Sequence, residues 1–291
     1  MRITCVARAG ALVGEGPVWD DRAQVLWWVD IKAPLLHRHD PATGENRSWP
    51  MPSRLGTVQL RESGGLIGAF KHGFGFIDPA TGAVTPIVHP EAHVPGNRFN
   101  DGGIDAAGRF WAGTMDDDEE RAPTGQLYRL DPDGSVTRFE ANFAITNGVD
   151  WSGDGRTLYF VDTVGGVIHA YDADPATGSL GARRPFARLD PIDGHPDGLV
   201  VDAEDHVWGA HWGGGRLTRY RPDGTVERVV PIPAAQVTSA CFGGPDLDQL
   251  YVTSAAIGLD AAARAATPDA GGLFRIDGLG IRGRPARRFA G

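Results

Sequence analysis

The sequence predicts an all-β fold, a six-bladed β-propeller of four-stranded antiparallel blades that takes in residues 1–291 as one domain. Two repeating features predict it. The first is a tight-turn motif with Asp or Pro near its start and Gly at its end, which is the chemistry of a hairpin turn. A β-rich segment with alternating character precedes each copy. The six turns fall at residues 40–44, 78–82, 131–134, 174–178, 221–224 and 276–278.

The second repeating feature is a pair of bulky residues in an earlier strand of each unit. With a further strand before each pair, the unit contains four strands over roughly 40 to 50 residues, which is the period of a propeller blade. Six units therefore predict six blades. The pairs are Trp27 and Trp28, Leu66 and Ile67, Phe110 and Trp111, Leu158 and Tyr159, Val207 and Trp208, and Leu250 and Tyr251.

The two ends of the chain are expected to close the ring. Residues 3–7 and 285–289 both have β-like character, and an open ring would leave unpaired sheet edges. We therefore expect both segments to complete one blade together. Helices should be nearly absent, with one short helix over residues 259–265 inside a loop.

Composition excludes several classes of protein. The net charge is -9, with 37 acidic and 28 basic residues, which argues against a general nucleic-acid binder. No stretch has the length of a membrane span, and the first residues lack the apolar run of a signal peptide, so we expect a cytoplasmic protein. Cys5 and Cys241 form neither a disulfide framework nor a CxxC pair. The chain lacks a GxSxG elbow, an HExxH motif and a P-loop, so metal-assisted hydrolysis fits better than a serine nucleophile.

Four oxygen-bearing side chains stand at matching positions in four repeats. Glu15, Asn100, Asn147 and Asp197 lie at the starts of the innermost strands of blades one, three, four and five, beside glycines. A ring of blades brings such positions to one point on its axis. Two carboxylates and amide oxygens suit one divalent cation, with water in the open positions, and Ca, Zn, Mn, Mg and Fe(II) all remain candidates. Without a cation, the two buried carboxylates would repel each other.

A simpler interpretation is that each Asp-Gly or Asn-Gly pair only turns the chain between strands. That interpretation suffices for Asp154, Asp205 and Asp223, which fall on the opposite face. The shared register of the other four favours a site.

Several further residues are expected on the same face. Arg98 precedes Asn100 by two positions and should point toward the same mouth, although it could instead pair with an acidic loop. The acidic run at residues 116–120 is typical of a solvated loop, but one member could touch a ligand. His195, His211 and Trp212 are expected on the rim as loop packing.

Five motifs in order give the chain a clear resemblance. It resembles the SMP-30/gluconolactonase/LRE (regucalcin-like) family along nearly its whole length, and residues 241–246 further resemble the sugar-lactonase branch. The motifs are Gly-Glu-Gly-Pro at 14–17, Asn-Arg-Phe-Asn-Asp-Gly at 97–102, Ala-Gly-Thr-Met at 112–115, Thr-Asn-Gly at 146–148 and Pro-Asp-Gly at 196–198.

The resemblance implies a role for each matching residue. Glu15, Asn147 and Asp197 would bind one divalent metal at the axis of the propeller, and Asp197 would also be the catalytic base. Arg98 and Asn100 would contact the substrate. Asp118 would be a third substrate contact, at a position where regucalcin has the longer side chain of a glutamate.

The resemblance also implies a reaction, the hydrolysis of a sugar (aldono-) lactone such as glucono-, xylono- or arabinonolactone to its aldonic acid. The metal would stabilise the oxyanion that forms when water attacks the carbonyl. Two alternatives stay open: a propeller hydrolase of phosphotriesters or other lactones, and a metal-binding propeller without turnover. The partner would be a small-molecule lactone, with neither nucleic acid nor membrane involved. The sequence leaves the oligomeric state open and is compatible with a monomer.

Overall fold

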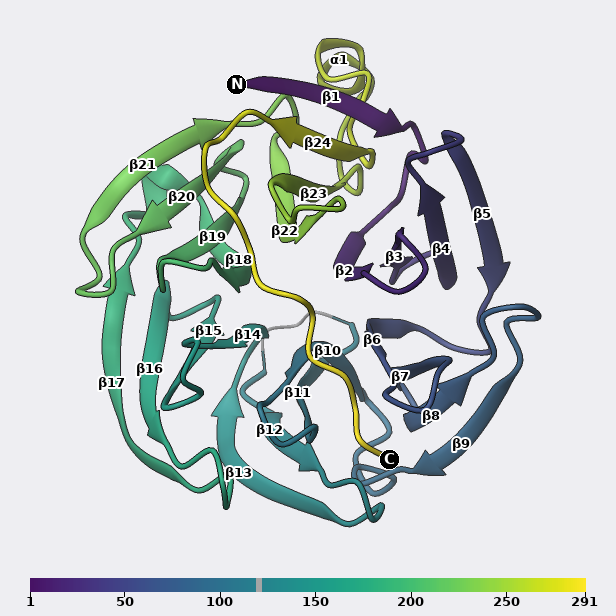
Figure 1. Cartoon of the computed structure of the whole chain (residues 1–291), viewed down its shortest axis with the longest axis vertical. Coiled ribbons are helices and arrows are strands. Elements are labelled where there is room, and N and C mark those ends of the chain that lie inside the picture. The colour runs from purple at the N-terminus through teal and green to yellow at the C-terminus, as the bar shows by residue number, and fades with distance from the viewer. Residues whose placement is uncertain (119–121) are drawn as a thin grey trace.

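The computed structural model describes residues 1–118 and 122–291, and its strands form six four-stranded antiparallel sheets around one axis (Figure 1). The predicted fold class is confirmed. In each of the first three blades the strands follow chain order from the axis outward. These are β2 (Gly14–Asp20), β3 (Val25–Asp30), β4 (Leu35–Asp40) and β5 (Glu45–Pro50); β6 (Leu55–Leu60), β7 (Leu66–Phe70), β8 (Gly73–Ile77) and β9 (Val84–Val88); and β10 (Asn97–Ile104), β11 (Phe110–Asp116), β12 (Gly125–Leu130) and β13 (Val136–Phe143).

Blades four and five repeat this order, and blade six closes the ring by taking its outermost strand from the N-terminal segment. β1 (Arg2–Ala7) pairs antiparallel with β24 (Leu273–Asp277), so the first and last strands of the chain share one sheet. The remaining strands are β14 (Thr146–Trp151), β15 (Thr157–Asp162), β16 (Val167–Ala173) and β17 (Leu180–Arg188); β18 (His195–Val201), β19 (Val207–Trp212), β20 (Arg216–Tyr220) and β21 (Val226–Pro231); and β22 (Gln236–Gly243) and β23 (Gln249–Ala255).

The expectation that residues 285–289 would join this blade is wrong. Residues 278–291 instead form an extended strap that crosses one face of the propeller, seen as the yellow trace in Figure 1. Its backbone and arginine side chains hydrogen-bond to the inner strand ends and turns of all six blades. The contacts reach Leu247, Ala203, Ser152, Asp20, Leu60 and Gly108.

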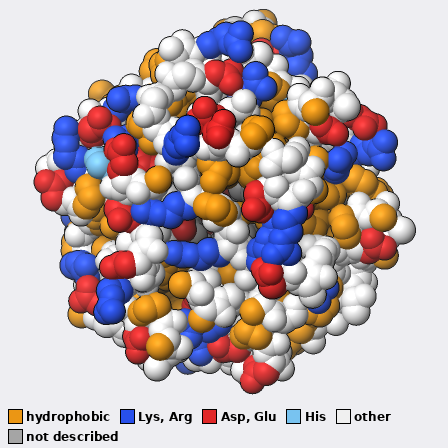
Figure 2. Space-filling model, in the orientation of Figure 1, with side chains coloured by type: hydrophobic (Ala, Val, Ile, Leu, Met, Phe, Trp, Pro, Cys, Tyr) orange, Lys and Arg blue, Asp and Glu red, His pale blue; other side chains and the backbone are white. Residues whose placement is uncertain are grey.

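The strap carries several basic side chains that pair with acidic turns. Arg284 lies 3.0 Å from Asp205, and Arg288 lies 2.8 Å from Asp20. Figure 2 shows this face, with Lys and Arg side chains across its middle and acidic side chains between them. Strap residues 285–289 thus follow the turns of the blades, not the edge of one sheet.

Helical structure among the described residues is confined to short segments. The predicted short helix is confirmed as α1 (Ala261–Ala266), between β23 and β24, and Asp260 caps it by accepting a hydrogen bond from the Ala263 backbone N–H. A 3-10 turn, η1, covers Pro191–Asp193. In the described part of the chain, no helix has the length and apolar character needed to cross a membrane.

Apolar side chains fill the spaces between neighbouring blades. Phe74 of blade two packs against Phe99 of blade three with ring centroids 4.6 Å apart, and both are buried. In blades three and five, a buried aspartate follows the innermost strand and accepts a hydrogen bond from the indole N–H of a buried tryptophan. These pairs are Asp105 with Trp111 and Asp202 with Trp208.

Candidate metal centre at the propeller axis

The innermost strands all begin at the end of the axis that lies opposite the strap, where a cavity of about 330 Å³ opens. Glu15, Asn100, Asn147 and Asp197 line this cavity, together with Arg98. The four come from β2, β10, β14 and β18, so each belongs to a different blade. All five side chains are buried. The structure therefore brings the sequence-predicted constellation to one point.

A local irregularity in each innermost strand aims these side chains at the axis. The pairing register shifts directly after Glu15, Phe99, Asn147 and Pro196, as a β-bulge does when it redirects a side chain. The glycines that follow Glu15, Asn147 and Asp197 then let the next blade approach. A Cβ on Gly148 would lie 2.7 Å from the Leu199 side chain of blade five.

The amide of Asn147 is held by hydrogen bonds on both sides. Its Nδ2 donates to Thr163 Oγ1 at 2.9 Å, and its Oδ1 accepts from Asn100 Nδ2 at 2.9 Å. Thr163 donates its own hydroxyl proton to the Pro196 carbonyl at 2.9 Å, so toward Asn147 it acts as the acceptor. On the other side, Arg98 Nη1 donates to Asn100 Oδ1 at 2.6 Å, which leaves the Asn100 amino group for Asn147. The network therefore turns the oxygen of Asn147 away from Thr163.

The two carboxylates are buried close to a third. Burial raises the pKa of Glu15 well above its ordinary value, and the charges of Asp197 and Asp101 raise it further. Burial likewise raises the pKa of Asp197, again with a contribution from Asp101. Asp101 itself has a pKa raised by burial to about 7. Such a site favours a bound positive charge, because a cation removes the cost of holding like charges together.

The donor set fits a hard divalent cation. Within residues 1–118 and 122–291, no three or more His, Cys, Asp and Glu side chains group as a metal site. The candidate ligands are therefore two carboxylates and the Asn147 amide oxygen, with space in the cavity for water or a substrate oxygen. Oxygen-only coordination with open positions is typical of calcium and magnesium.

Comparison with known proteins shows the family to which the chain belongs. Residues 13–256 match the model of the SMP-30/Gluconolactonase/LRE-like region. The chain belongs to this family. Regucalcin of Xenopus laevis is 38% identical over 296 residues, which cover 100% of this chain and 99% of the relative. Human regucalcin is 36% identical with the same coverage.

Solved structures of family members superpose closely on the chain. A luciferin-regenerating enzyme matches with a TM-score of 0.92 and 32% identity, covering 99% of each chain. A regucalcin from Agrobacterium tumefaciens, described as a calcium-binding protein, matches with a TM-score of 0.93 and 34% identity, covering 98% of this chain and 96% of that one. The family resemblance expected from the motifs is confirmed.

Asp118, which the family motif suggests as a substrate contact, lies apart from the cavity. It is exposed and does not line the wall, and its backbone N–H donates to Asp116 Oδ1 at 3.2 Å. Its contact with substrate stays a prediction. Glu119 and Glu120, the last members of the acidic run, lie outside the described residues.

The sequence did not predict a role for the neighbouring Asp117, whose buried carboxylate lies among several basic side chains. Its carboxylate lies 3.3 Å from Arg98 Nε and 2.6 Å from Lys71 Nζ, and it also pairs with Arg54. Burial acts to raise its pKa, but the hydrogen bonds from Lys71 and Arg54 and the charge of Arg98 lower it overall. Asp117 therefore holds the Arg98 side chain in place through an ion pair. The sequence could not indicate this role, because Asp117 is one of five consecutive acidic residues and nothing in the sequence distinguishes it from the others.

Of the other residues that the sequence places on the rim, some line the cavity and one does not. His195 and Trp212 line the cavity. His211 is buried outside the cavity wall, with its Nδ1 2.9 Å from the Asp193 carbonyl, as expected for loop packing. Thr163 lines the cavity although nothing in the sequence singled it out.

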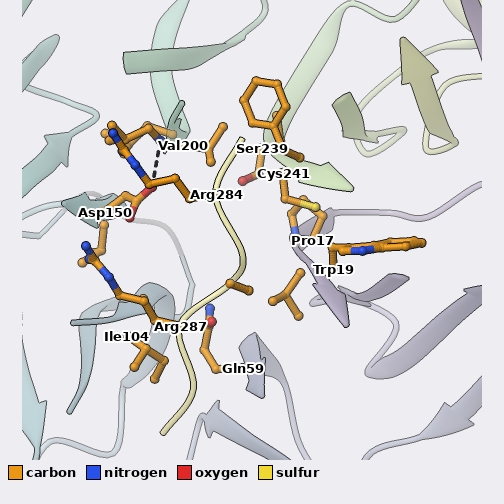
Figure 3. Close-up of a pocket in the computed structure, with 18 of the residues that line it drawn as sticks. Pro17, Trp19, Gln59, Ile104, Asp150, Val200, Ser239, Cys241, Arg284 and Arg287 are labelled. Atoms are coloured by element: carbon orange, nitrogen blue, oxygen red, sulfur yellow. Dashed lines mark hydrogen bonds between the residues drawn. The ribbon is translucent and has the colours of Figure 1, made fainter. Parts of the chain in front are cut away.

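A second cavity, of about 360 Å³, lies under the strap at the other end of the axis (Figure 3). Gln59, Asp150 and Ser239 line it together with Arg284 and Arg287 of the strap. Both oxygens of the Asp150 carboxylate already accept hydrogen bonds from the protein. The donors are the Val201 and Trp151 backbone N–H groups, at 2.7 and 2.8 Å. No described residue lines both cavities. The larger cavity thus contains none of the candidate metal ligands.

Proposed function

We propose that this chain is a metal-dependent lactonase that hydrolyses a sugar (aldono-) lactone, such as glucono-, xylono- or arabinonolactone, to the aldonic acid. The observation that carries the proposal is the meeting of Glu15, Asn147 and Asp197 at the floor of one open cavity. Membership of a family that includes gluconolactonases supports the same reaction.

Glu15, Asp197 and the Asn147 oxygen are the residues that would hold the cation. When bound, a divalent cation would polarise the lactone carbonyl and stabilise the negative charge that develops on its oxygen. Calcium is the first candidate because the Agrobacterium tumefaciens relative is described as calcium-binding. Magnesium, manganese, zinc and iron(II) accept the same ligands.

The protein residues would perform the proton transfer and orient the substrate. Asp197 would accept a proton from the attacking water, because its carboxylate lines the same cavity as the other candidate ligands. Arg98 and Asn100 would hold ring hydroxyls on one side of the cavity, with Asp118 as a further contact. Attack by water on the carbonyl carbon then breaks the ring C–O bond and yields the hydroxy acid.

Chelation should abolish lactone opening. We expect the protein to hydrolyse at least one pentono- or hexonolactone faster than the spontaneous rate, to lose this activity in EDTA, and to regain it with one of the five cations. The measurement is a pH-indicator assay corrected for spontaneous opening, with a phosphotriester as the comparison substrate. Turnover that survives complete metal removal would contradict the proposal.

Replacing Thr163 by Val should weaken cation binding by roughly 10- to 100-fold, the usual cost of losing a group that orients a metal ligand. Valine has the shape of threonine but cannot accept the hydrogen bond from Asn147 Nδ2. Thr163→Ser keeps the hydroxyl and serves as the matched control. Both are measured by calorimetric titration of the chelated protein, and equal affinities for the two variants would show that Thr163 does not position Asn147.

The two alternatives make different predictions in the same assay. A phosphotriesterase would prefer the phosphotriester, and a lactonase of larger substrates would turn over neither the phosphotriester nor the small sugar lactones. The apolar lining residues Met115, Ile145 and Val164 favour this alternative. A non-catalytic propeller would gain thermal stability from the cation without turning over any substrate. The concave cavity lined by Arg98 and Asn100 supports an enzyme over that reading. A cytoplasmic location stays a prediction.

A further inference from the structure

One side of the cavity that holds the candidate metal centre is apolar. Val13, Trp212 and Ile257 form this apolar wall, and they belong to blades one, five and six. All three pack against one hydrophobic cluster that extends into blades one and two. Apart from Glu15 and Asp197 at the axis, the polar groups that these three blades contribute to the described lining of the cavity are His195 and the indole N–H of Trp212.

Arg98 and Asn100 stand on the opposite side, where Met115, Ile145 and Val164 also line the cavity. Arg98 and Asn100 come from β10 in blade three, and the blades follow one another in chain order around the ring (Figure 1). In a six-membered ring, blade three faces blade six across the axis. A ligand bound at the centre therefore meets hydrogen-bond donors on one edge and Ile257 on the other.

Backbone hydrogen bonds hold the apolar wall in place. The Ile257 N–H donates to the Leu12 carbonyl at 3.0 Å, and the Ala256 N–H donates to the Ala11 carbonyl at 3.0 Å. Val13 pairs with Ala255 through a single antiparallel β-bridge. These hydrogen bonds join the loop that follows β23 to the segment before β2. The apolar wall is therefore already formed before a ligand binds.

A hydroxyl group placed against Val13 or Ile257 would lose hydrogen bonds to water, and neither side chain can replace them. An alkyl group in the same place would remove apolar surface from water. The volume of about 330 Å³ is at the low end for small-molecule sites, which favours a single ring with a short substituent over a long acyl chain.

We propose that the preferred substrates are deoxy-sugar lactones, which carry hydroxyls on the ring edge facing Arg98 and Asn100 and a terminal methyl group facing the apolar wall. This inference rests on the proposed lactonase function. It selects a 6-deoxyhexonolactone over the hexonolactone of the same configuration, whose terminal carbon carries a hydroxyl.

The test compares the two lactones on the metal-loaded protein. We expect kcat/KM to favour the 6-deoxy compound by roughly 10-fold, the discrimination typical of one small group in an apolar pocket. Ile257→Thr should reduce this ratio to about 3-fold or less, because it adds a hydroxyl to the wall. Ile257→Val has nearly the same shape as Ile257→Thr and should keep the preference.

Binding is measured in parallel with the 1,5-anhydrohexitol and its 6-deoxy form, which cannot be hydrolysed. Tighter binding of the 6-deoxy form supports the inference even where neither lactone is opened, in which case the proposed reaction alone is wrong. Equal or better use of the hydroxylated compounds by the unaltered protein would overturn the inference. So would identical ratios for Ile257→Thr and Ile257→Val.

Discussion

Asp197→Ala should lower the rate of lactone opening by about 10³-fold or more, because it removes both a metal ligand and the proposed base. The protein should remain folded. Asp197 is buried, and both its burial and the charge of Asp101 raise its pKa and disfavour its ionised form, so the native state does not depend on its charge for stability. The measurements are kcat in saturating metal and the thermal unfolding midpoint.

Blade five supplies a matched control for this variant. Asp223 also precedes a glycine in a tight turn, but it lies on the other side of the blade, is exposed, and accepts hydrogen bonds from the backbone N–H and the hydroxyl of Thr225. Asp223→Ala should leave kcat unchanged. A near-normal rate in Asp197→Ala would remove this residue from the mechanism, and an equal loss in both variants would point to damage to blade five.

The same pair of aspartates illustrates what the sequence can predict. Asp197-Gly198 and Asp223-Gly224 are identical dipeptides, and only their position within the repeat assigns one to the axis and the other to an outer turn. Repetition is informative because each blade must present the same strand to the axis. The blades and the axial residues could therefore be predicted from turn spacing and register.

Residues without an equivalent in other repeats could not be predicted in this way. Thr163 matters because its hydroxyl lies between Asn147 and the Pro196 carbonyl, a contact between two blades. Asp117 gathers basic side chains from different blades. Residues 285–289 looked like a strand of blade six, but the backbone of Phe289 bonds to Leu60 and Glu62 of blade two, and Arg287 and Arg288 reach blades four and one. Each of these depends on contacts between distant segments, which local pattern does not encode.

Asp202→Ala should lower the free energy of unfolding by about 2 to 4 kcal/mol, because it removes the acceptor of several hydrogen bonds and each buried donor left unsatisfied costs about 1 to 3 kcal/mol. Asp202 is completely buried, and its carboxylate accepts from Arg219 Nε at 2.8 Å and from Trp208 Nε1 at 3.0 Å. It also accepts from the backbone N–H groups of Glu204 and His206 at 2.9 and 3.0 Å. Alanine would leave the buried Trp208 indole N–H without an acceptor and would remove the acceptor of the two backbone N–H groups.

Two comparisons separate this effect from a general sensitivity of blade five. Asp202→Asn keeps one acceptor oxygen and should lose less stability than Asp202→Ala, while exposed Asp223→Ala should hardly move the midpoint of urea unfolding. Arg219 retains Glu204 and Glu227 at 2.7 and 3.0 Å, so the loss in Asp202→Ala comes mainly from the indole and backbone donors. If Asp202→Ala unfolds at the same urea concentration as the unaltered protein, the buried aspartate does not stabilise the blade. The same result would then be expected for Asp105 of blade three. Its carboxylate likewise accepts hydrogen bonds from a tryptophan and an arginine, Trp111 and Arg109.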